Sequence, residues 1–187
     1  MRPLLRYGSA AQRDTLLPML AQGRELASFA FTEPAAGSNP TAIQATARPD
    51  GQGGWFLSGS KKWIGTAGWA GVLHVFAHVV DDDGSRRGIT AFTVRQDATG
   101  LVQGAEELTM GMRGMIQNAV HLHDVRVGPG DVLGDIGQGM RIAQDIMEFG
   151  RVCIAATGVG LMMRAGQLMT RYAGRRGIAT GRLLDNF

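Results

Sequence analysis

Short runs of apolar residues, many alternating with polar ones at a period of two, fill the middle of the chain, from residue 27 to residue 133. Clusters of glycine, proline and aspartate separate these runs. Because alternation places every second side chain on one face of a sheet, the runs predict strands. No helical pattern lies between them, which favours an antiparallel β-barrel or sandwich. A first short strand runs through Phe31, and the others are predicted at 45–48, 55–58, 72–80, 89–94, 101–104 and 118–127.

Helical patterns flank this β region on both sides. Ser9 has the character of an N-cap for a short helix over 9–21, which Pro18 is expected to interrupt. After residue 137 a second helical pattern begins, and from Arg151 apolar residues recur at steps of three and four. This spacing predicts a long amphipathic helix. Its apolar positions are Val152, Ala155, Val159, Met162, Met163, Ala165, Met169 and Tyr172.

The predicted fold class is therefore α+β, an antiparallel barrel or sandwich flanked by a short N-terminal helix and a long C-terminal amphipathic helix. The expected segments are a helical remnant at 1–26, a β domain at 27–134 and the start of an incomplete helical domain at 135–187. The apolar stripe of the long helix needs a partner, and residues 177–187 are too few to supply it. Three partners are possible: the β domain covers the stripe, two subunits pair along it, or the chain is a piece of a larger protein. We expect the last two together.

Composition and charge narrow the function classes. The net charge is +3, but the basic residues are spread along the chain, which suits a phosphate-bearing ligand and argues against nucleic acid. The single cysteine, Cys153, excludes an internal disulfide and is compatible with a reducing compartment. Neither a signal peptide nor a run of about 18 apolar residues is evident. We therefore expect a soluble cytoplasmic protein without a membrane span.

Two stretches carry candidate chemistry. Residues 29–39 run from an apolar strand through the turn Thr32-Glu33-Pro34 into a loop of small residues that includes Ser38. Small residues leave backbone N–H groups open, so that a bulky ligand can approach closely. Residues 61–66 then place Trp63 after two lysines. Each stretch alone is more often a turn at a strand end or a barrel aromatic, so the ligand interpretation depends on both together.

The two stretches, with later segments, resemble the acyl-CoA dehydrogenase family, specifically its middle β domain with the flanking helices. The segments occur in the family's order and close to its spacing from about residue 20 onward. The resemblance implies FAD as the cofactor and an acyl thioester as the substrate. In this chemistry a carboxylate removes the α proton while hydride passes to the flavin. The matching segments are 29–39, 59–64, 108–113, 120–127, 133–140 and 172–184.

The resemblance also implies roles for individual residues. Thr32 would donate a hydrogen bond at the flavin edge, and Trp63 with Ile64 would pack against the isoalloxazine ring. Arg176 would reach the flavin pyrophosphate on a neighbouring subunit, a role suited to guanidinium geometry. The implied cofactor contacts are Phe29, Phe31, Thr32, Gly37, Ser38, Trp63, Ile64, Gly65, Thr66 and Arg176, and the implied substrate contacts are Ser38 and Arg151.

Several positions depart from the family's pattern. Phe29 stands where tyrosine is common. Gly65 stands where a threonine or serine supplies a hydrogen bond near flavin N5, so either its backbone N–H or the hydroxyl of Thr66 would have to serve. Met115 and Gln117 replace small or hydroxyl residues and would reshape the same face.

No catalytic base is assigned within the chain. In most family members the catalytic glutamate lies in the C-terminal helical domain, beyond residue 187. A minority carry it just before the arginine matched by Arg151, where this chain has Gly150. Glu148 would point to a different side of a helix, and Arg151 fits either an active-site residue or a helix residue paired with Glu148. We therefore expect an incomplete form of the family.

The resemblance further implies a homodimer or homotetramer, an electron-transfer flavoprotein or similar acceptor, and a place in fatty acid metabolism. Two other functions stay open. A flavin monooxygenase or oxidase of the same superfamily is suggested by Gly65 and the altered segment 115–118. A non-catalytic fragment or interaction module is suggested by Gly150 and the missing helical domain.

The strand histidines His74 with His78 and His121 with His123 lack a third ligand, so no metal is expected.

Overall fold

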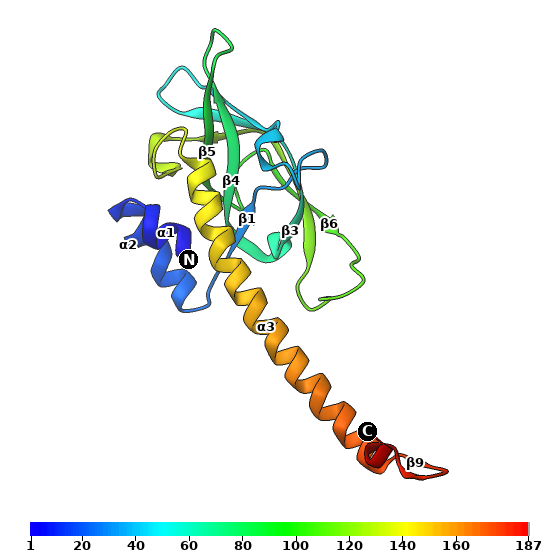
Figure 1. Cartoon of the computed structure of the whole chain (residues 1–187). Coiled ribbons are helices and arrows are strands. Elements are labelled where there is room, and N and C mark those ends of the chain that lie inside the picture. The colour runs from blue at the N-terminus through cyan, green and yellow to red at the C-terminus, as the bar shows by residue number, and fades with distance from the viewer. Residues whose placement is uncertain (187) are drawn as a thin grey trace. The chain divides into compact units, whose positions relative to one another are not determined.

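The structure is a computed structural model that describes residues 1–186 of the chain. They form two compact units, which divide between Gln144 and Asp145. The first unit contains two short helices and an eight-stranded sheet, and the second contains most of a long helix and a small hairpin (Figure 1). The expected segments 1–26, 27–134 and 135–187 stay a prediction about domains.

The eight-stranded sheet contains every strand that the alternation predicts. Its path runs β6-β7-β3-β2-β4-β5-β8, and β1 pairs with β4 beside this path. Most observed strands differ from the predicted ones by one to three residues at their ends. β3 continues to Gly65, seven residues beyond the predicted end, and β1 ends at Ala30, before Phe31. The bounds are β1 (Leu26–Ala30), β2 (Thr46–Pro49), β3 (Trp55–Gly65), β4 (Ala70–Val80), β5 (Arg86–Arg95), β6 (Leu101–Glu106), β7 (Gln117–Val127) and β8 (Val132–Leu133).

The α+β class is confirmed, but the sheet is mixed and open rather than purely antiparallel and closed. β1 and β2 both run parallel to β4, at the registers Ala30↔Val75 and Thr46↔His78. The reason is that β1 and β2 lie one after the other along the same edge of β4 and run in the same direction. β6 and β8 lie at the two ends of the strand path and do not pair with each other.

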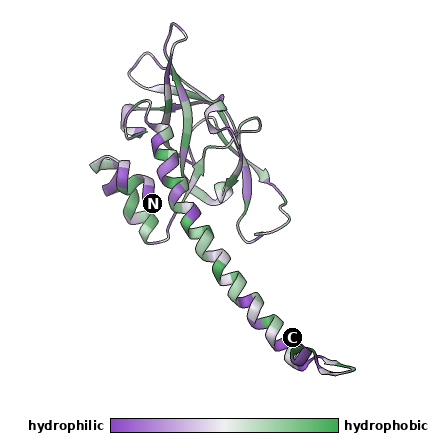
Figure 2. Ribbon diagram, viewed as in Figure 1, coloured by the Kyte–Doolittle hydropathy of each residue, from purple (hydrophilic) through white to green (hydrophobic). Residues whose placement is uncertain are grey.

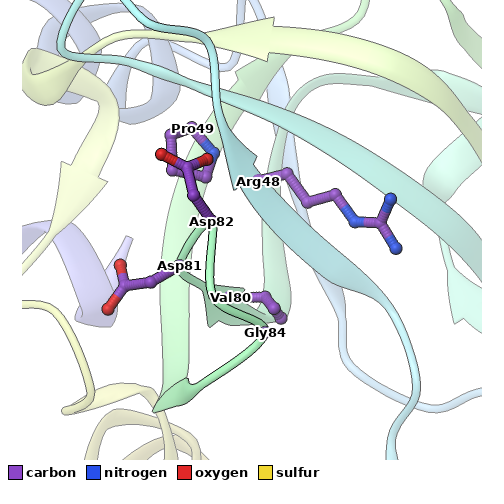
Figure 3. A pocket seen from close by; sticks show the side chains of 6 residues that line it. All are labelled: Arg48, Pro49, Val80, Asp81, Asp82 and Gly84. Carbon is purple, nitrogen blue, oxygen red and sulfur yellow. The ribbon is translucent and has the colours of Figure 1, made fainter.

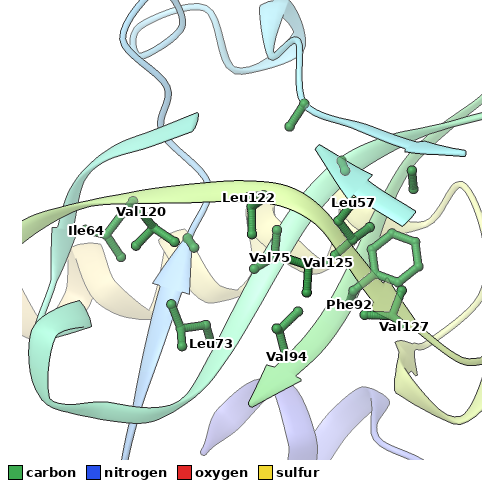
Figure 4. Packing of buried hydrophobic residues seen from close by; sticks show 14 of the residues in the cluster. Leu57, Ile64, Leu73, Val75, Phe92, Val94, Val120, Leu122, Val125 and Val127 are labelled. Carbon is green, nitrogen blue, oxygen red and sulfur yellow. The ribbon is translucent and has the colours of Figure 1, made fainter. Parts of the chain in front are cut away.

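The hydrophobic core lies within the bend of this sheet. Side chains from the β3–β7 half and from the β4–β5 half meet there, as Figure 4 shows. Leu57, Leu73, Phe92, Val120 and Val125 are all 0% exposed. Burying each such side chain contributes roughly 1.5–3 kcal/mol. The core therefore fixes the frame from which the loops project.

Two helices, α1 (Arg2–Tyr7) and α2 (Ala10–Ala21), precede the sheet. Ser9 caps α2 as expected, in a capping box with Gln12. The Gln12 amide also donates to the carbonyls of Gly130 and Val132, which ties α2 to the segment leading into β8. The expected interruption at Pro18 is wrong, because the helix continues through it. A proline this near the helix end removes one hydrogen bond, while α2 still buries Leu16 and Leu20.

The remaining elements are short turns of helix, the long helix α3 (Gly139–Arg175) and a hairpin. An 18-residue window of α3 has a mean hydropathy of 1.4, so this helix is long and apolar enough to cross a membrane by length and composition only. Figure 2 shows the apolar residues along it. Core helices of soluble proteins pass the same test, so it does not assign α3 to a membrane. The other bounds are η1 (Pro40–Ala42), η2 (Ala67–Trp69), η3 (Pro129–Asp131), β9 (Gly177–Ile178), β10 (Gly181–Arg182) and η4 (Leu183–Asn186).

Candidate flavin site

A loop of residues 31–45, here called the site loop, forms the centre of the candidate site. β1 pairs with β4 as far as Val75, and β2 resumes the pairing at His78. The site loop therefore spans the interval in which this edge of β4 has no neighbouring strand. At its far end the His78 N–H donates to the Ala45 carbonyl at 2.8 Å. The loop carries the predicted contacts Thr32, Gly37 and Ser38.

Lys61 on β3 anchors the start of the site loop. Its side chain is 0% exposed. Nζ donates to Glu33 Oε1 at 2.7 Å, to the Phe31 carbonyl at 3.2 Å and to the Phe76 carbonyl at 2.5 Å. An ammonium group has three donors, so all of them are used. Burial lowers the pKa of Lys61 to about 8, while the adjacent Glu33 carboxylate acts in the opposite direction.

The Glu33 carboxylate ties the start of the site loop to its end. Oε2 accepts from the Gln44 N–H at 2.6 Å and Oε1 accepts from the Ala45 N–H at 3.0 Å. Glu33 also forms a backbone bridge with Ala36, with N···O distances of 3.0 and 3.1 Å, immediately before Gly37. Glu33 is 6% exposed, so water scarcely competes for these contacts. One carboxylate thus holds both ends of the loop.

A bulge in β3 presents Trp63 beside the site loop. The pairing of β3 with β7 shifts between Lys61 and Ile64, and Trp63 has a φ of 58°, which bulky residues rarely adopt. The Lys62 N–H donates to the Thr32 carbonyl at 2.9 Å and so holds the bulge against the loop. The indole is 50% exposed, with Lys62 Nζ at 5.0 Å from the ring centroid. A strained position therefore displays an exposed aromatic side chain one residue after Lys62, whose N–H binds the Thr32 carbonyl.

The hydrogen-bond donors of the site loop are open to a ligand. Gly37 and Ser38 are exposed, and within residues 1–186 their N–H groups and the hydroxyls of Ser38 and Thr32 have no hydrogen-bond partner. A Cβ added at Gly37 would meet only Thr32 Cγ2, at 3.9 Å. Free N–H groups of this kind bind phosphate oxygens, and an exposed indole suits a flat ring. The residues present therefore fit FAD, which has both a pyrophosphate and a flat ring.

Three of the implied cofactor contacts are apolar residues that differ in burial. The ring centroids of Phe29 and Phe31 each lie 5.0 Å from that of Phe76, so both rings pack on β4. Phe31 is 4% exposed, and Ile64 is 1% exposed and belongs to the core (Figure 4). The flavin contacts implied for Phe31 and Ile64 stay predictions, and both side chains pack within the protein. Phe29 is half-buried and stays partly accessible.

Gly65 and Thr66 end the bulge. The Thr66 hydroxyl donates to the Gly65 carbonyl at 2.7 Å and lies 3.2 Å from the Ser28 hydroxyl. Thr66 also has a φ of 59°, which is unusual for a β-branched residue. A Cβ added at Gly65 would lie 3.6 Å from Met115 Cε and from Gln117 Nε2. The two donors considered near flavin N5 are the Gly65 N–H and the Thr66 hydroxyl. The Thr66 hydroxyl already has hydrogen-bond partners within the protein.

Arg151 and Arg176 belong to the second unit, and both are exposed. In the described part of the chain no ion pair joins Arg151 to Glu148, so the helix pairing considered for Arg151 is not formed. The backbone of Arg176 accepts from the Leu183 N–H at 2.9 Å and so links the end of α3 to the segment after the hairpin. The contacts of both arginines with cofactor and substrate stay predictions. Arg151 lines a shallow hollow with Met147, Gly150, Ile154 and Ala155.

Other parts of the first unit offer weaker candidates. A hollow near the turn between β4 and β5 has a volume of ≈ 350 Å³. In Figure 3 the side chain of Arg48 points away from Asp81 and Asp82. No group of three or more His, Cys, Asp or Glu residues is placed to hold a metal ion in the searched residues 1–186. In the same residues, Nε2 of His74 and both ring nitrogens of His78 have no hydrogen-bond partner. The hollow is lined by Arg48, Pro49, Val80, Asp81, Asp82 and Gly84.

Sequence reasoning missed the roles of Glu33 and Lys61. Both residues stand in the stretches singled out from the sequence, but they are 28 positions apart, and nothing in the pattern pairs them. The sequence offered no clear signal for this pairing, because the strand predicted at 55–58 ends before Lys61.

Comparisons with known proteins agree with this geometry. Residues 28–125 match the family described as acyl-CoA dehydrogenase, middle domain, and residues 137–187 match the one described as acyl-CoA dehydrogenase, C-terminal domain. The mitochondrial very long-chain specific acyl-CoA dehydrogenase of Mus musculus is 37% identical over 164 residues, which cover 85% of this chain and 25% of that protein.

Two solved structures are similar over nearly the whole chain. An acyl-CoA dehydrogenase complexed with FAD from Bacillus anthracis has a TM-score of 0.88 and 32% identity, and the match covers 97% of this chain and 31% of that one. A prolyl acyl carrier protein oxidase has a TM-score of 0.90 and 32% identity, covering 100% and 48%. The chain thus spans between a quarter and a half of the length of these three proteins. Because the matches include α3, that helix has a counterpart in both solved structures.

Proposed function

Because the chain belongs to the acyl-CoA dehydrogenase family, we propose that it provides the FAD-binding β domain for the α,β-dehydrogenation of an acyl thioester. The observation that carries the proposal is the site loop beside Trp63. Free N–H groups at Gly37 and Ser38 suit the pyrophosphate, and the exposed indole suits the ring. When bound, FAD supplies the hydride acceptor for this reaction.

In this proposal the residues of the chain bind and orient the cofactor and the substrate. Thr32 offers an unpartnered hydroxyl next to Trp63, and Ser38 faces solvent where both cofactor and substrate can approach. Arg151 is proposed to contact substrate, and Arg176 the pyrophosphate of a neighbouring subunit. No residue of the chain is assigned as the base that removes the α proton.

The substrate is proposed to be an acyl-CoA or a carrier-bound acyl group, in fatty acid metabolism. The electron acceptor is proposed to be an electron-transfer flavoprotein or similar protein. A homodimer or homotetramer in the cytoplasm completes the proposal, and nothing in the geometry requires nucleic acid.

An oxidase of the same superfamily is the second candidate. The observation that favours it is Gly65, which leaves the space next to Met115 and Gln117 without a side chain. Similarity to a prolyl acyl carrier protein oxidase points in the same direction.

Anaerobic titration with acyl thioesters tests the dehydrogenase proposal. The chain is reconstituted with FAD, freed of excess cofactor, and mixed without oxygen with acyl-CoAs of increasing length. Loss of the oxidised flavin band with formation of the enoyl thioester supports dehydrogenation. Retention of the band with every thioester contradicts it for this chain and favours the non-catalytic alternative. A flavin that is reduced and then rapidly reoxidised by air alone favours the oxidase.

A further inference from the structure

On one edge of β4, neither β1 nor β2 pairs with the residues between Val75 and His78, and the side chain of Lys61 reaches this interval. After Val75 the pairing with β1 stops, and the Phe76 carbonyl on this edge accepts instead from Lys61 Nζ. The same ammonium reaches the Phe31 carbonyl and the Glu33 carboxylate at the start of the site loop. Lys61 thus joins this edge of β4 to the start of the site loop through three hydrogen bonds from one buried group.

Glu33 passes this constraint to the exposed part of the loop. Its carboxylate holds the N–H groups of Gln44 and Ala45 at the far end. Its backbone forms the tight bridge with Ala36, and Gly37 follows at once. Movement of Glu33 would therefore displace the donors of Gly37 and also release the loop end.

We propose that Glu33 and Lys61 are a positioning pair, which sets the shape of the site loop and so aims the free donors of Gly37 and Ser38 at the phosphates of the cofactor. This inference rests on the proposed function, since it takes FAD as the ligand. Neither residue touches the cofactor, and both act through the loop.

Energetics favour positioning over stability as the role of this pair. A buried ion pair contributes little more to folding than apolar residues of the same volume, because both charges must leave water. The pair does impose direction, since each ammonium hydrogen and each carboxylate oxygen has a fixed partner. Apolar replacements could fill the space but could not hold the Gln44 and Ala45 N–H groups.

The test compares FAD affinity with stability in matched variants of the whole chain. Glu33→Gln keeps the shape of the side chain but turns an amide N–H toward one of its present donors. Lys61→Met removes the ammonium and keeps an unbranched apolar chain. Val125→Ala, in the core and outside the site loop, is the control that lowers stability. FAD affinity is measured by flavin fluorescence, stability by thermal unfolding, and loop order by hydrogen exchange of the Gln44 and Ala45 amides.

We expect Glu33→Gln and Lys61→Met each to weaken FAD binding about tenfold or more and to speed exchange at both amides. Val125→Ala should lower the melting temperature with FAD affinity unchanged. Equal FAD affinity in the wild-type chain and in both pair variants overturns the inference, and so does a loss no larger than that of Val125→Ala. If Lys61→Met does not fold, Glu33→Gln alone decides. A wild-type chain that binds no FAD instead contradicts the proposed function.

Discussion

Lys61 Nζ lies 2.7 Å from Glu33 Oε1, and the two side chains are 0% and 5% exposed. This contact joins β3 to a loop that carries no regular structure between β1 and its short turn of helix η1. Because the carboxylate also holds the far end of the loop, one buried ion pair determines the surface on which the proposed cofactor binds.

Removing the ammonium should destabilise the fold strongly. Lys61→Met leaves the Glu33 carboxylate buried without its counter-charge, so we expect the free energy of unfolding to fall by about 3–5 kcal/mol. Urea unfolding measures it. Lys62→Met is the matched control, since its ion pair with Glu107, at 3.4 Å, is partly exposed and should contribute no more than about 1 kcal/mol. Equal losses in the two variants would contradict the account.

FAD affinity should fall as pH rises through about 8. The pKa of Lys61 is lowered to about 8 from 10.5, mainly by burial. Above it the neutral amine holds Glu33 less firmly, and we expect binding to weaken by about threefold to tenfold. His78 is a further titratable group near this pair, and the charges of Glu33, Lys61 and Arg86 act on it. Fluorescence titration of FAD at several pH values provides the measurement.

Stability should respond to the same titration with the opposite sign. Between pH 8 and 10.5 the unfolded chain binds more protons at Lys61 than the folded chain, so this group's contribution to stability increases with pH in that window. Lys61→Met should abolish both trends. A fall of FAD affinity above pH 8 that persists in Lys61→Met would mean that another group is responsible.

Trp63→Ala should impair binding more than folding. The indole is 50% exposed and its backbone is strained at a φ of 58°, so its loss should change stability by less than about 1 kcal/mol. FAD affinity should fall by about tenfold or more, because base–aromatic stacking of this kind contributes roughly 1–3 kcal/mol. Trp69→Ala, at 55% exposure, is the control. Equal FAD affinity of the two variants would exclude Trp63 as the ring platform.

His74 should make the fold sensitive to acid. Burial, followed by the nearby N-terminal amino group, lowers its pKa to about 4 from 6.5. The unfolded chain binds the proton more tightly, so the stability that this neutral group allows is lost as pH falls from 6.5 toward 4. His74→Leu should reduce the loss of unfolding free energy between pH 7 and pH 5, measured by urea unfolding. An unchanged pH dependence would contradict this assignment.

The strands were predictable because burial on one face imposes alternation. The runs at 72–80 and 118–127 correspond to β4 at Ala70–Val80 and β7 at Gln117–Val127. The partners of each strand were not predictable, since alternation determines faces and not neighbours. The parallel pairing of β1 and β2 with β4 therefore came only with the structure.

The candidate site was predictable as a set of segments but not as a geometry. The resemblance brought the loop at 29–39 and the segment at 61–66 together, and the Thr32–Lys62 backbone hydrogen bond joins them. The depth of individual side chains was not predictable. A bulge in β3 turns Trp63 outward and leaves Ile64 in the core, and bulges have no clear signal in a single sequence.

The most direct test of the account is whether FAD stays bound to the chain. The purified chain is mixed with FAD, passed through a gel-filtration column, and its visible spectrum is recorded across the protein peak. The account predicts a flavin band that co-elutes with the wild-type chain and is reduced in Trp63→Ala. A protein peak without flavin absorbance from the wild-type chain would contradict the proposed FAD site.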